Sequence, residues 1–227
     1  MAQRDCPRPH TARGYGCMTV PAGVILAGGL ARRMGGGDKG LRLVAGQPLL
    51  SRVIERLAPQ CSALALNANG DPARFRDLGL PVLPDTVPDH PGPLAGVLAG
   101  LDWAAAEGHR AIVTAAADTP FFPRNLVHDL QAAAGPSGLA LAASRDAEGL
   151  HRQPTFGLWP AALRQDLRMA LRDGLRKIVL WTDRHGAGTA VFDAVPYDPF
   201  FNVNHPEDLA EAARLASLAD AQSMSPR

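Results

Sequence analysis

The sequence predicts a three-layer α/β/α domain with a mostly parallel, Rossmann-like sheet. Short apolar runs without charge alternate along the chain with segments whose apolar residues recur at helical spacing. Polar residues directly follow several of these runs, which is typical of open parallel sheets that bind ligands at their strand ends. The chain has 227 residues, 46% of them hydrophobic, which suffices for one domain with a substantial core.

The first expected strand, Val24–Leu26, runs into the glycine pair Gly28 and Gly29. A loop without side chains lets a ligand approach the backbone, so that successive N–H groups can point at an anion. Arg33 and Lys39 add positive charge around a second glycine cluster, and the compact lysine ammonium suits a phosphate chain. The loop therefore predicts binding of a nucleoside triphosphate, although composition alone also allows a plain structural turn.

Two familiar phosphate motifs do not fit this loop. Lys39 is followed by Gly40 rather than by Ser or Thr, so the P-loop pattern with its magnesium-binding hydroxyl is missing. Gly28 and Gly29 are adjacent, which breaks the Gly-x-Gly-x-x-Gly dinucleotide fingerprint. A different kind of phosphate loop is indicated.

The stretch resembles the signature of the molybdenum cofactor guanylyltransferases in the segments Leu26-Ala27-Gly28-Gly29, Arg33-Met34-Gly35-Gly36 and Asp38-Lys39-Gly40-Leu41. Many cytidylyl and sugar-nucleotide enzymes share the first segment, whereas the Asp-Lys-Gly ending is more specific. The resemblance covers roughly Val20 to Leu215 and implies a fold of the nucleotide-diphospho-sugar transferase type. It assigns Leu26, Ala27, Gly28, Gly29 and Lys39 to nucleotide binding.

Further strands and helices are expected in alternation. Pro48 can open a helix, because its missing N–H costs nothing at that position, and Pro72 can do the same after Asp71. We expect strands at residues 41–44, 64–66, 81–85, 111–117, 139–144, 151–158 and 191–195. We expect helices at residues 48–57, 71–78, 93–106, 122–134 and 161–173, and a final helix that begins at Pro206.

Polar residues close three of the expected strands. The resemblance assigns Asn67 and Asp85 to recognition of the guanine nucleotide, although Asp85 could instead cap a turn. Asn69, which precedes a glycine, is better interpreted as a turn former. Asp118 ends an uncharged run, where a carboxylate can hold Mg2+ on a triphosphate; its alternative role is a helix cap.

The resemblance also implies a second substrate, a pterin, and a second group of polar residues supplies candidate contacts to it. His151 opens an expected strand and could also be a packing or surface histidine. Arg176 and Lys177 match a basic segment of the resembled family but could simply be solvated. Alternation places Asn202 and Asn204 on one side of an extended segment before the last helix, where their amides can hold phosphate, a pterin edge or metal-bound water. Helix capping would explain Asn204 but leave Asn202 unexplained.

The resemblance implies transfer of GMP from GTP to molybdopterin, with release of pyrophosphate and formation of the guanine dinucleotide cofactor. Such a transfer needs positioning and charge neutralisation, for which Arg33, Lys39 and Mg2+ on Asp118 are the candidates. The alternatives are a cytidylyltransferase or sugar-phosphate nucleotidylyltransferase, or a nucleotide-binding adaptor without chemistry. A molybdoenzyme or cofactor-delivery chaperone is a candidate protein partner.

Composition bounds the other partners and the compartment. Twenty-three basic and 22 acidic residues give a net charge of +1, so neither nucleic acid nor a membrane surface is predicted. Cys6, Cys17 and Cys61 are odd in number and match no zinc pattern, which favours a reducing cytoplasm.

The ends of the chain are expected to lie outside the domain. Residues 1–19 are polar and lack the apolar core of a signal peptide, so we expect a disordered extension, with Met18 as an alternative natural start. Residues 20–217 form the expected single domain, and residues 218–227 a frayed tail.

Overall fold

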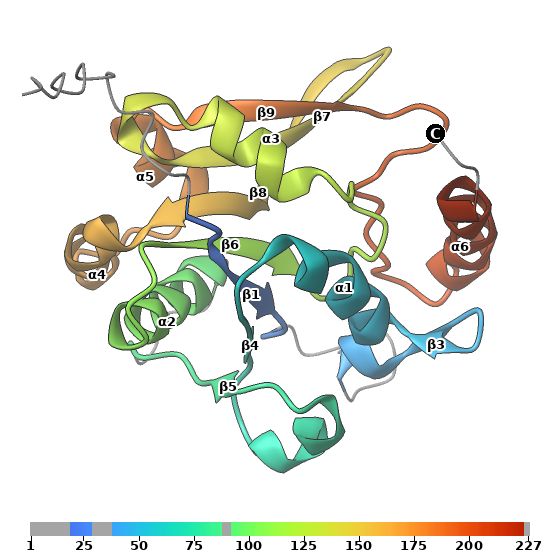
Figure 1. The fold of residues 1–227 in the computed structure, drawn as a ribbon, viewed down its shortest axis with the longest axis horizontal. Helices are drawn as coiled ribbons and strands as arrows, with labels where there is room; N and C mark the ends of the chain where they lie inside the picture. The colour runs from blue at the N-terminus through green and yellow to red at the C-terminus, as the bar shows by residue number, and fades with distance from the viewer. Residues whose placement is uncertain (1–18, 29–37, 88–91, 225–227) are drawn as a thin grey trace, which may run out of the picture.

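The computed structural model describes residues 19–28, 38–87 and 92–224, with side chains described up to residue 219. Its centre is a seven-stranded sheet in the order β5-β4-β1-β6-β8-β7-β9 (Figure 1). In that order the strands are Val82–Leu83, Leu64–Asn67, Ala22–Leu26, Ala111–Ala116, Gly149–Pro160, Ala140–Asp146 and Gly188–Asp193. Strand β8 runs antiparallel to both of its neighbours, and the other neighbouring pairs are parallel, so the predicted mostly parallel sheet is confirmed.

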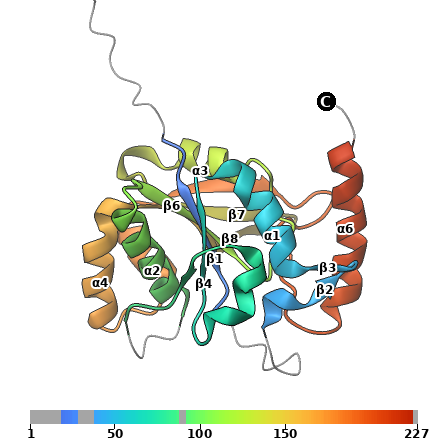
Figure 2. The same cartoon turned by 60° about the horizontal axis from the view of Figure 1, so that its bottom comes forward.

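Helices cover both faces of the sheet, as the predicted three-layer architecture requires (Figures 1 and 2). One face packs against α1 and α3, and the other against α2, α4 and α5. Alternate residues of each strand supply the two cores: Val24 and Ile112 face α2, whereas Ile25 and Val113 face α1. The α-helices are Leu49–Leu57, Pro93–Ala106, Leu126–Ala133, Arg164–Arg172, Ile178–Arg184 and Asp208–Met224.

A third, smaller core fixes the last helix beside the sheet. Side chains of α6 pack with Val44 of β2 (Leu43–Val44), Leu49, Phe121 and Val203. Strand β2 forms a two-stranded ribbon with β3 (Gln47–Pro48). The helix continues past Ser217, where the sequence predicts fraying, and Ala219 is still buried. Short 3-10 helices complete the fold: η2 (Lys39–Leu41), η3 (Ala58–Gln60), η4 (Pro72–Leu78), η5 (Gly135–Ser137) and η6 (Ala161–Leu163).

Several predicted boundaries were wrong. Helix α3 begins at Leu126 rather than at residue 122, because Pro123 disfavours helical geometry in the residue before it. The predicted strand at 41–44 is partly the turn η2. The connection between the strands predicted at 139–144 and 151–158 is shorter than expected, since β7 and β8 pair as far as Asp146 and Gly149. Helix α5 was not predicted.

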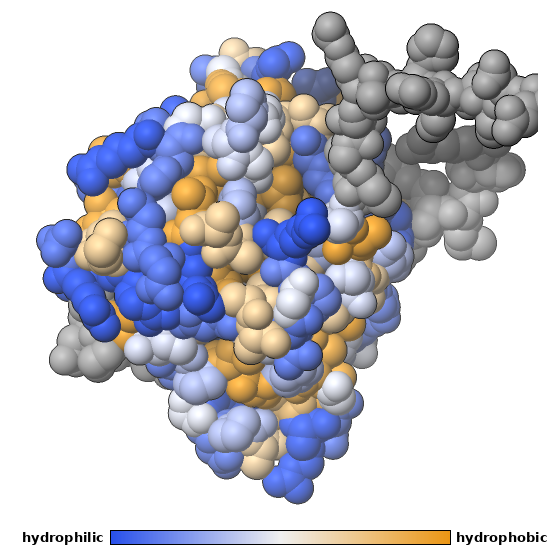
Figure 3. Space-filling model, turned by 60° about the vertical axis from the view of Figure 1, so that its left-hand side comes forward, coloured by the Kyte–Doolittle hydropathy of each residue, from blue (hydrophilic) through white to orange (hydrophobic). Residues whose placement is uncertain are grey.

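The surface over α4 and α5 is mixed in character. Figure 3 shows this side of the molecule, on which hydrophilic residues lie between smaller apolar areas. Met169 and Leu180 are among its exposed apolar side chains. Within the described ranges, none of the helices combines the length and apolar character that a membrane span requires.

Candidate active site

Three central strands end at the same edge of the sheet. In the sheet register Leu26 pairs with Asn67 on one side and with Ala116 on the other. The hydrogen bonds continue past the strand ends, from the Ala27 N–H to the Asn67 carbonyl at 2.8 Å and from the Ala117 N–H to the Leu26 carbonyl at 3.1 Å. The polar residues that follow these strands are therefore held on a rigid platform.

Lys39 and Asp118 form an ion pair at this edge. The Lys39 ammonium lies 2.6 Å from Asp118 Oδ2, and the two side chains are only 14% and 23% exposed. Gly40 is buried after the lysine, and a Cβ at this position would lie 3.3 Å from Leu50 and 3.6 Å from Ala117. The glycine thus lets η2 pack closely beside the end of β6, which places Lys39 next to Asp118.

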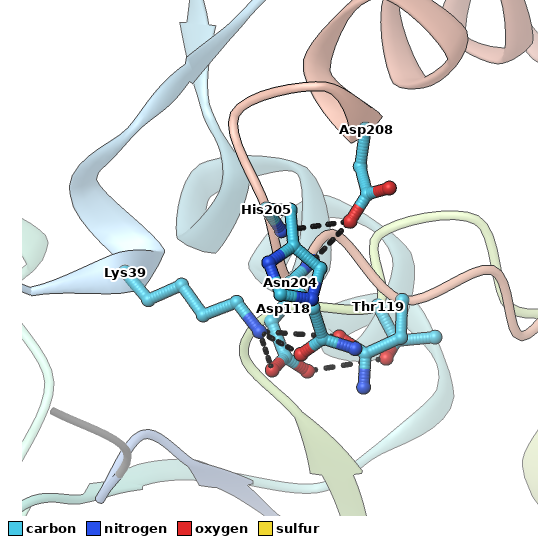
Figure 4. A network of polar contacts seen from close by, with 7 residues as sticks. Lys39, Asp118, Thr119, Asn204, His205 and Asp208 are labelled. Atoms are coloured by element: carbon cyan, nitrogen blue, oxygen red, sulfur yellow. Dashed lines mark hydrogen bonds and ion pairs between the residues drawn. The ribbon is translucent and has the colours of Figure 1, made fainter. Parts of the chain in front are cut away.

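Two amide oxygens from the other end of the chain complete the cluster (Figure 4). Lys39 Nζ donates to Asn204 Oδ1 at 2.5 Å and to Asn202 Oδ1 at 3.3 Å. Between them, the Val203 N–H donates to the Asp118 carbonyl at 2.9 Å, and the Val203 side chain is fully buried. Both asparagines, which the sequence grouped with the pterin contacts, thus lie around Lys39 and Asp118.

Asp208 holds this asparagine segment from behind. Its Oδ2 accepts hydrogen bonds from the Asn204 N–H at 2.7 Å and from the His205 N–H at 2.8 Å, at the start of α6 (Figure 4). These backbone donors, the His205 N–H foremost, hold the pKa of Asp208 below its ordinary value, and the Lys39 charge acts in the same direction. A carboxylate at this helix start therefore orients the amide that faces Lys39.

A second polar cluster lies at the ends of β4 and β5. The Asn67 amide nitrogen donates to the Leu83 carbonyl at 3.0 Å and to Asp85 Oδ1 at 2.9 Å. Asn69 donates to Asp85 Oδ2 at 2.8 Å, and its own amide oxygen accepts from the Asp85 N–H at 2.9 Å. The Asp85 carboxylate is therefore held at both oxygens, and Asn69 does more than form a turn.

Asn67 also fits against the first turn of α2. It is 4% exposed, and a Cβ on Gly96 would lie 2.1 Å from its Oδ1 and 3.0 Å from Leu26 Cδ2. Only a residue without a side chain lets the helix approach so closely. The start of α2 and the end of β4 consequently form one packed unit.

The oxygen atoms around Lys39 suit a hard cation. Asp118 supplies a carboxylate, and Asn202 and Asn204 supply amide oxygens, all directed at one positive charge. Magnesium is commonly bound in this way, by one or two carboxylates with substrate phosphates completing its ligands. Within the described part of the chain, there is no cluster of three or more His, Cys, Asp and Glu residues that would form an all-protein metal site.

The other predicted residues are placed differently. Arg33 and Gly29 lie outside the described residues, whereas Leu26 and Ala27 are partly buried and Gly28 is exposed beside Asn67.

The predicted pterin-side residues other than the two asparagines lie outside the Lys39 cluster. His151 lies in the β7–β8 hairpin, 2.8 Å from Asp146 Oδ1. Arg176 and Lys177 are exposed in the segment between α4 and α5, at the other side of the molecule from α6 (Figure 1).

Two further residues at the site were missed by the sequence reasoning. Asp208 was not singled out within the final helix predicted from Pro206, although its position four residues after Asn204 is a usable capping signal. Arg74 was not singled out at all; it contacts Asn69 and Asp38, and no local pattern relates it to Asp38.

Comparison with known proteins gives consistent results. The family model described as "MobA-like NTP transferase domain" matches residues 23–186. A molybdenum cofactor guanylyltransferase of Bradyrhizobium sp. (strain ORS 278) is 56% identical over 207 residues, which cover 89% of this chain and 96% of the relative. One from Nitrobacter hamburgensis is 52% identical over 199 residues, covering 86% and 94%.

Solved structures share the fold at lower identity. Molybdopterin-guanine dinucleotide biosynthesis protein A from Archaeoglobus fulgidus has a TM-score of 0.63 and 22% identity, covering 87% of this chain and 99% of that chain. A CMP:2-keto-3-deoxy-manno-octonic acid synthetase complexed with CTP has a TM-score of 0.65 and 14% identity, with the same coverage. These likenesses support the predicted nucleotide-diphospho-sugar transferase type of fold.

Proposed function

The chain belongs to the molybdenum cofactor guanylyltransferases, within the family of MobA-like NTP transferase domains, and we propose how its residues carry out the reaction. The protein is a nucleotidyltransferase that transfers GMP from GTP to the molybdenum cofactor, forming the guanine dinucleotide cofactor and releasing pyrophosphate. A cytidylyl or sugar-phosphate activity is not favoured, since relatives at 56% and 52% identity are molybdenum cofactor guanylyltransferases.

The catalytic residues in this proposal are Arg33, Lys39 and Asp118. An oxygen of the molybdopterin phosphate attacks the α-phosphorus of GTP in line, and the bond from that phosphorus to the leaving pyrophosphate breaks. Because negative charge grows on the pyrophosphate, the Lys39 ammonium and the Arg33 guanidinium act by neutralising it. The partly buried setting of Lys39, whose side chain is 14% exposed, strengthens its interaction with phosphate.

A divalent metal is generally required for nucleotidyl transfer, and we propose Mg2+ as the ion. It would be held by Asp118, with the amide oxygens of Asn202 and Asn204 available to it or to its bound water. When bound, the ion would neutralise triphosphate charge and orient the phosphates. In that state Lys39 would turn from Asp118 to the phosphates.

The nucleotide contacts in this proposal lie along the shared strand edge. The backbone of the segment Leu26-Ala27-Gly28-Gly29 approaches the nucleotide, and Asn67 and Asp85 recognise guanine. The Asp85 carboxylate, already held by two asparagine amides, can accept hydrogen bonds from the guanine N–H groups. Cytosine presents a different pattern of donors, so this acid favours GTP.

The pterin-side contacts are proposed at His151, Arg176, Lys177, Asn202 and Asn204. The two asparagines have the stronger support, because they lie beside the proposed reacting phosphates. We further propose a cytoplasmic location, with a molybdoenzyme or a delivery chaperone as the acceptor of the product.

One observation carries the proposal: a partly buried lysine paired with a strand-end aspartate and two asparagines, in a chain 56% identical to a guanylyltransferase. The test is pyrophosphate release with Mg2+ and molybdenum cofactor in the presence of GTP, CTP, ATP or UTP. We expect release with GTP and loss of at least 100-fold in Asp118→Asn, since ion-holding carboxylates contribute several kcal/mol, or at least about 100-fold in rate. Equal turnover with CTP, or near-normal activity of Asp118→Asn, would overturn the assignment.

A further inference from the structure

Arg74 contacts Asn69 of the second polar cluster and Asp38, the chain neighbour of Lys39 in the first. It belongs to η4, and its Nη2 donates to the Asn69 carbonyl at 2.6 Å. Its Nε lies 2.7 Å from Oδ2 of Asp38, the residue that directly precedes Lys39. One side chain thus joins the loop that holds Asp85 to the segment that carries the lysine.

The surroundings hold the Arg74 guanidinium in this position. Its central carbon lies 4.7 Å from the centroid of the buried Phe75 ring. Gly70 leaves room on another side, because a Cβ there would be 2.8 Å from Arg74 Nη1. Asp71 fixes the start of η4 by accepting from the Ala73 N–H at 2.9 Å. The local sequence Gly-Asp-Pro-Ala-Arg-Phe is therefore arranged around the guanidinium.

The geometry requires an arginine rather than a general positive charge. A guanidinium presents several donors in a fixed plane, so two of its nitrogens can bind a carbonyl and a carboxylate at once, whereas a lysine ammonium is a single point charge. The Arg74 and Asp38 side chains are 31% and 18% exposed, and ion pairs near solvent contribute little to folding stability. Positioning is therefore the larger role of this contact.

We propose that Arg74 is a positioning residue that couples guanine recognition to the reacting phosphates. On the function proposed above, it keeps the Asn69–Asp85 pair and the Asp38–Lys39 segment in fixed relation, so that a correctly bound base brings Lys39 to the triphosphate. Loss of the guanidinium removes the contact to the Asn69–Asp85 pair and the contact to the Asp38–Lys39 segment at the same time. Base selectivity and turnover should then fall together.

The test compares Arg74→Ala and Arg74→Lys with Arg76→Ala. Arg76 lies on the same short helix and is exposed, and the one described hydrogen bond of its side chain goes to the nearby Ala73 carbonyl, so its removal is a matched loss of charge. The substrates are GTP and ITP, which lacks the guanine 2-amino group. For each variant, kcat and KM are measured by pyrophosphate release, and binding of each nucleotide is measured by thermal unfolding.

We expect Arg74→Ala to lower the GTP-to-ITP ratio of kcat/KM about tenfold, which corresponds to about 1.4 kcal/mol, and to lower kcat as well. Arg74→Lys should behave like Arg74→Ala, and Arg76→Ala like the unchanged protein. In Asp38→Asn the effect of Arg74→Ala on kcat should shrink, because the two residues act through one contact.

Two results would overturn the inference. The first is an Arg74→Ala variant whose selectivity and kcat equal those of Arg76→Ala. The second is a change in only selectivity or only kcat, which would mean that guanine recognition and the reacting phosphates are not coupled through Arg74. Failure of the unchanged protein to release pyrophosphate would instead refute the proposed reaction, while the GTP-to-ITP binding ratio would still report on Arg74.

Discussion

Gly96→Ala should damage nucleotide binding although alanine is the better helix former. The new methyl group would lie 2.1 Å from Asn67 Oδ1 and 2.8 Å from its Cγ, which are impossible contacts. Asn67 is 4% exposed, so it cannot rotate into solvent without breaking its bonds to the Leu83 carbonyl and to Asp85. The substitution therefore displaces the amide that holds the Asp85 carboxylate.

The two broken hydrogen bonds of Asn67 set the size of the effect. At about 0.5–1.5 kcal/mol each, they amount to about 1–3 kcal/mol. Against this loss, alanine is more favourable than glycine in a helix by up to about 1 kcal/mol. With this full gain subtracted, the net loss is up to about 2 kcal/mol, which lowers the melting temperature of a chain of this size by up to about 8 °C.

The assay is thermal unfolding with and without GTP and a divalent cation, with Gly100→Ala as the control. A Cβ on Gly100 would lie 2.8 Å from Val24 and 2.9 Å from Ile112, so this variant also overpacks α2 against the sheet, but away from Asn67. Both variants should unfold at a lower temperature than the unchanged protein. Only Gly96→Ala should lose most of the rise in melting temperature that GTP produces. An undiminished rise in Gly96→Ala would refute the role given to Asn67 and Asp85.

Three further predictions follow from the same geometry. Lys39→Met should lower kcat at least about 100-fold while Asn202 and Asn204 remain in place, because a preorganised charge on the leaving group is lost; unchanged single-turnover rates would contradict this. The folded state lowers the pKa of Asp208, so this carboxylate stabilises the fold above its unfolded pKa of about 3.9, and the stabilisation is lost as the pH falls through the folded pKa. In Asp208→Asn, the stability measured by fluorescence should therefore fall less steeply with acidification. Burial raises the pKa of the Cys61 thiol to about 12, so after replacement of the other cysteines by serine this thiol should resist alkylation at pH 8 until the protein is denatured; rapid labelling of the native protein, seen by mass spectrometry, would count against it.

The central part of the fold could be predicted because its signals are local. Uncharged runs that alternate with helical spacing predicted β1, β4 and β6, and the residues after them predicted the strand-edge cluster. The alternation of Asn202 and Asn204 predicted that both face one side, and both bond Lys39. Their position beside the lysine could not be derived, because it depends on how α6 packs on the third core.

Other features depend on contacts between distant segments. Arg74 meets Asp38 only after η4 folds back over the lysine segment, and nothing in either local sequence indicates it. Helix α5 is too short to show a recognisable helical periodicity in the sequence. It is stabilised by tertiary packing, in which Trp181 is buried against Trp159. The roles of His151, Arg176 and Lys177 stay predictions.

The contacts of Lys39 have a consequence for protein synthesis. Its three oxygen partners lie 79, 163 and 165 positions further along the chain. Bringing residues so far apart in the chain together costs conformational entropy, and the contacts of the docked C-terminal segment offset this cost. A nascent chain that extends just past β6 carries Lys39 and Asp118 but neither asparagine. We therefore expect catalytic competence to appear only when translation is nearly finished, so that chains interrupted or clipped before Asn204 are inert and do not consume GTP.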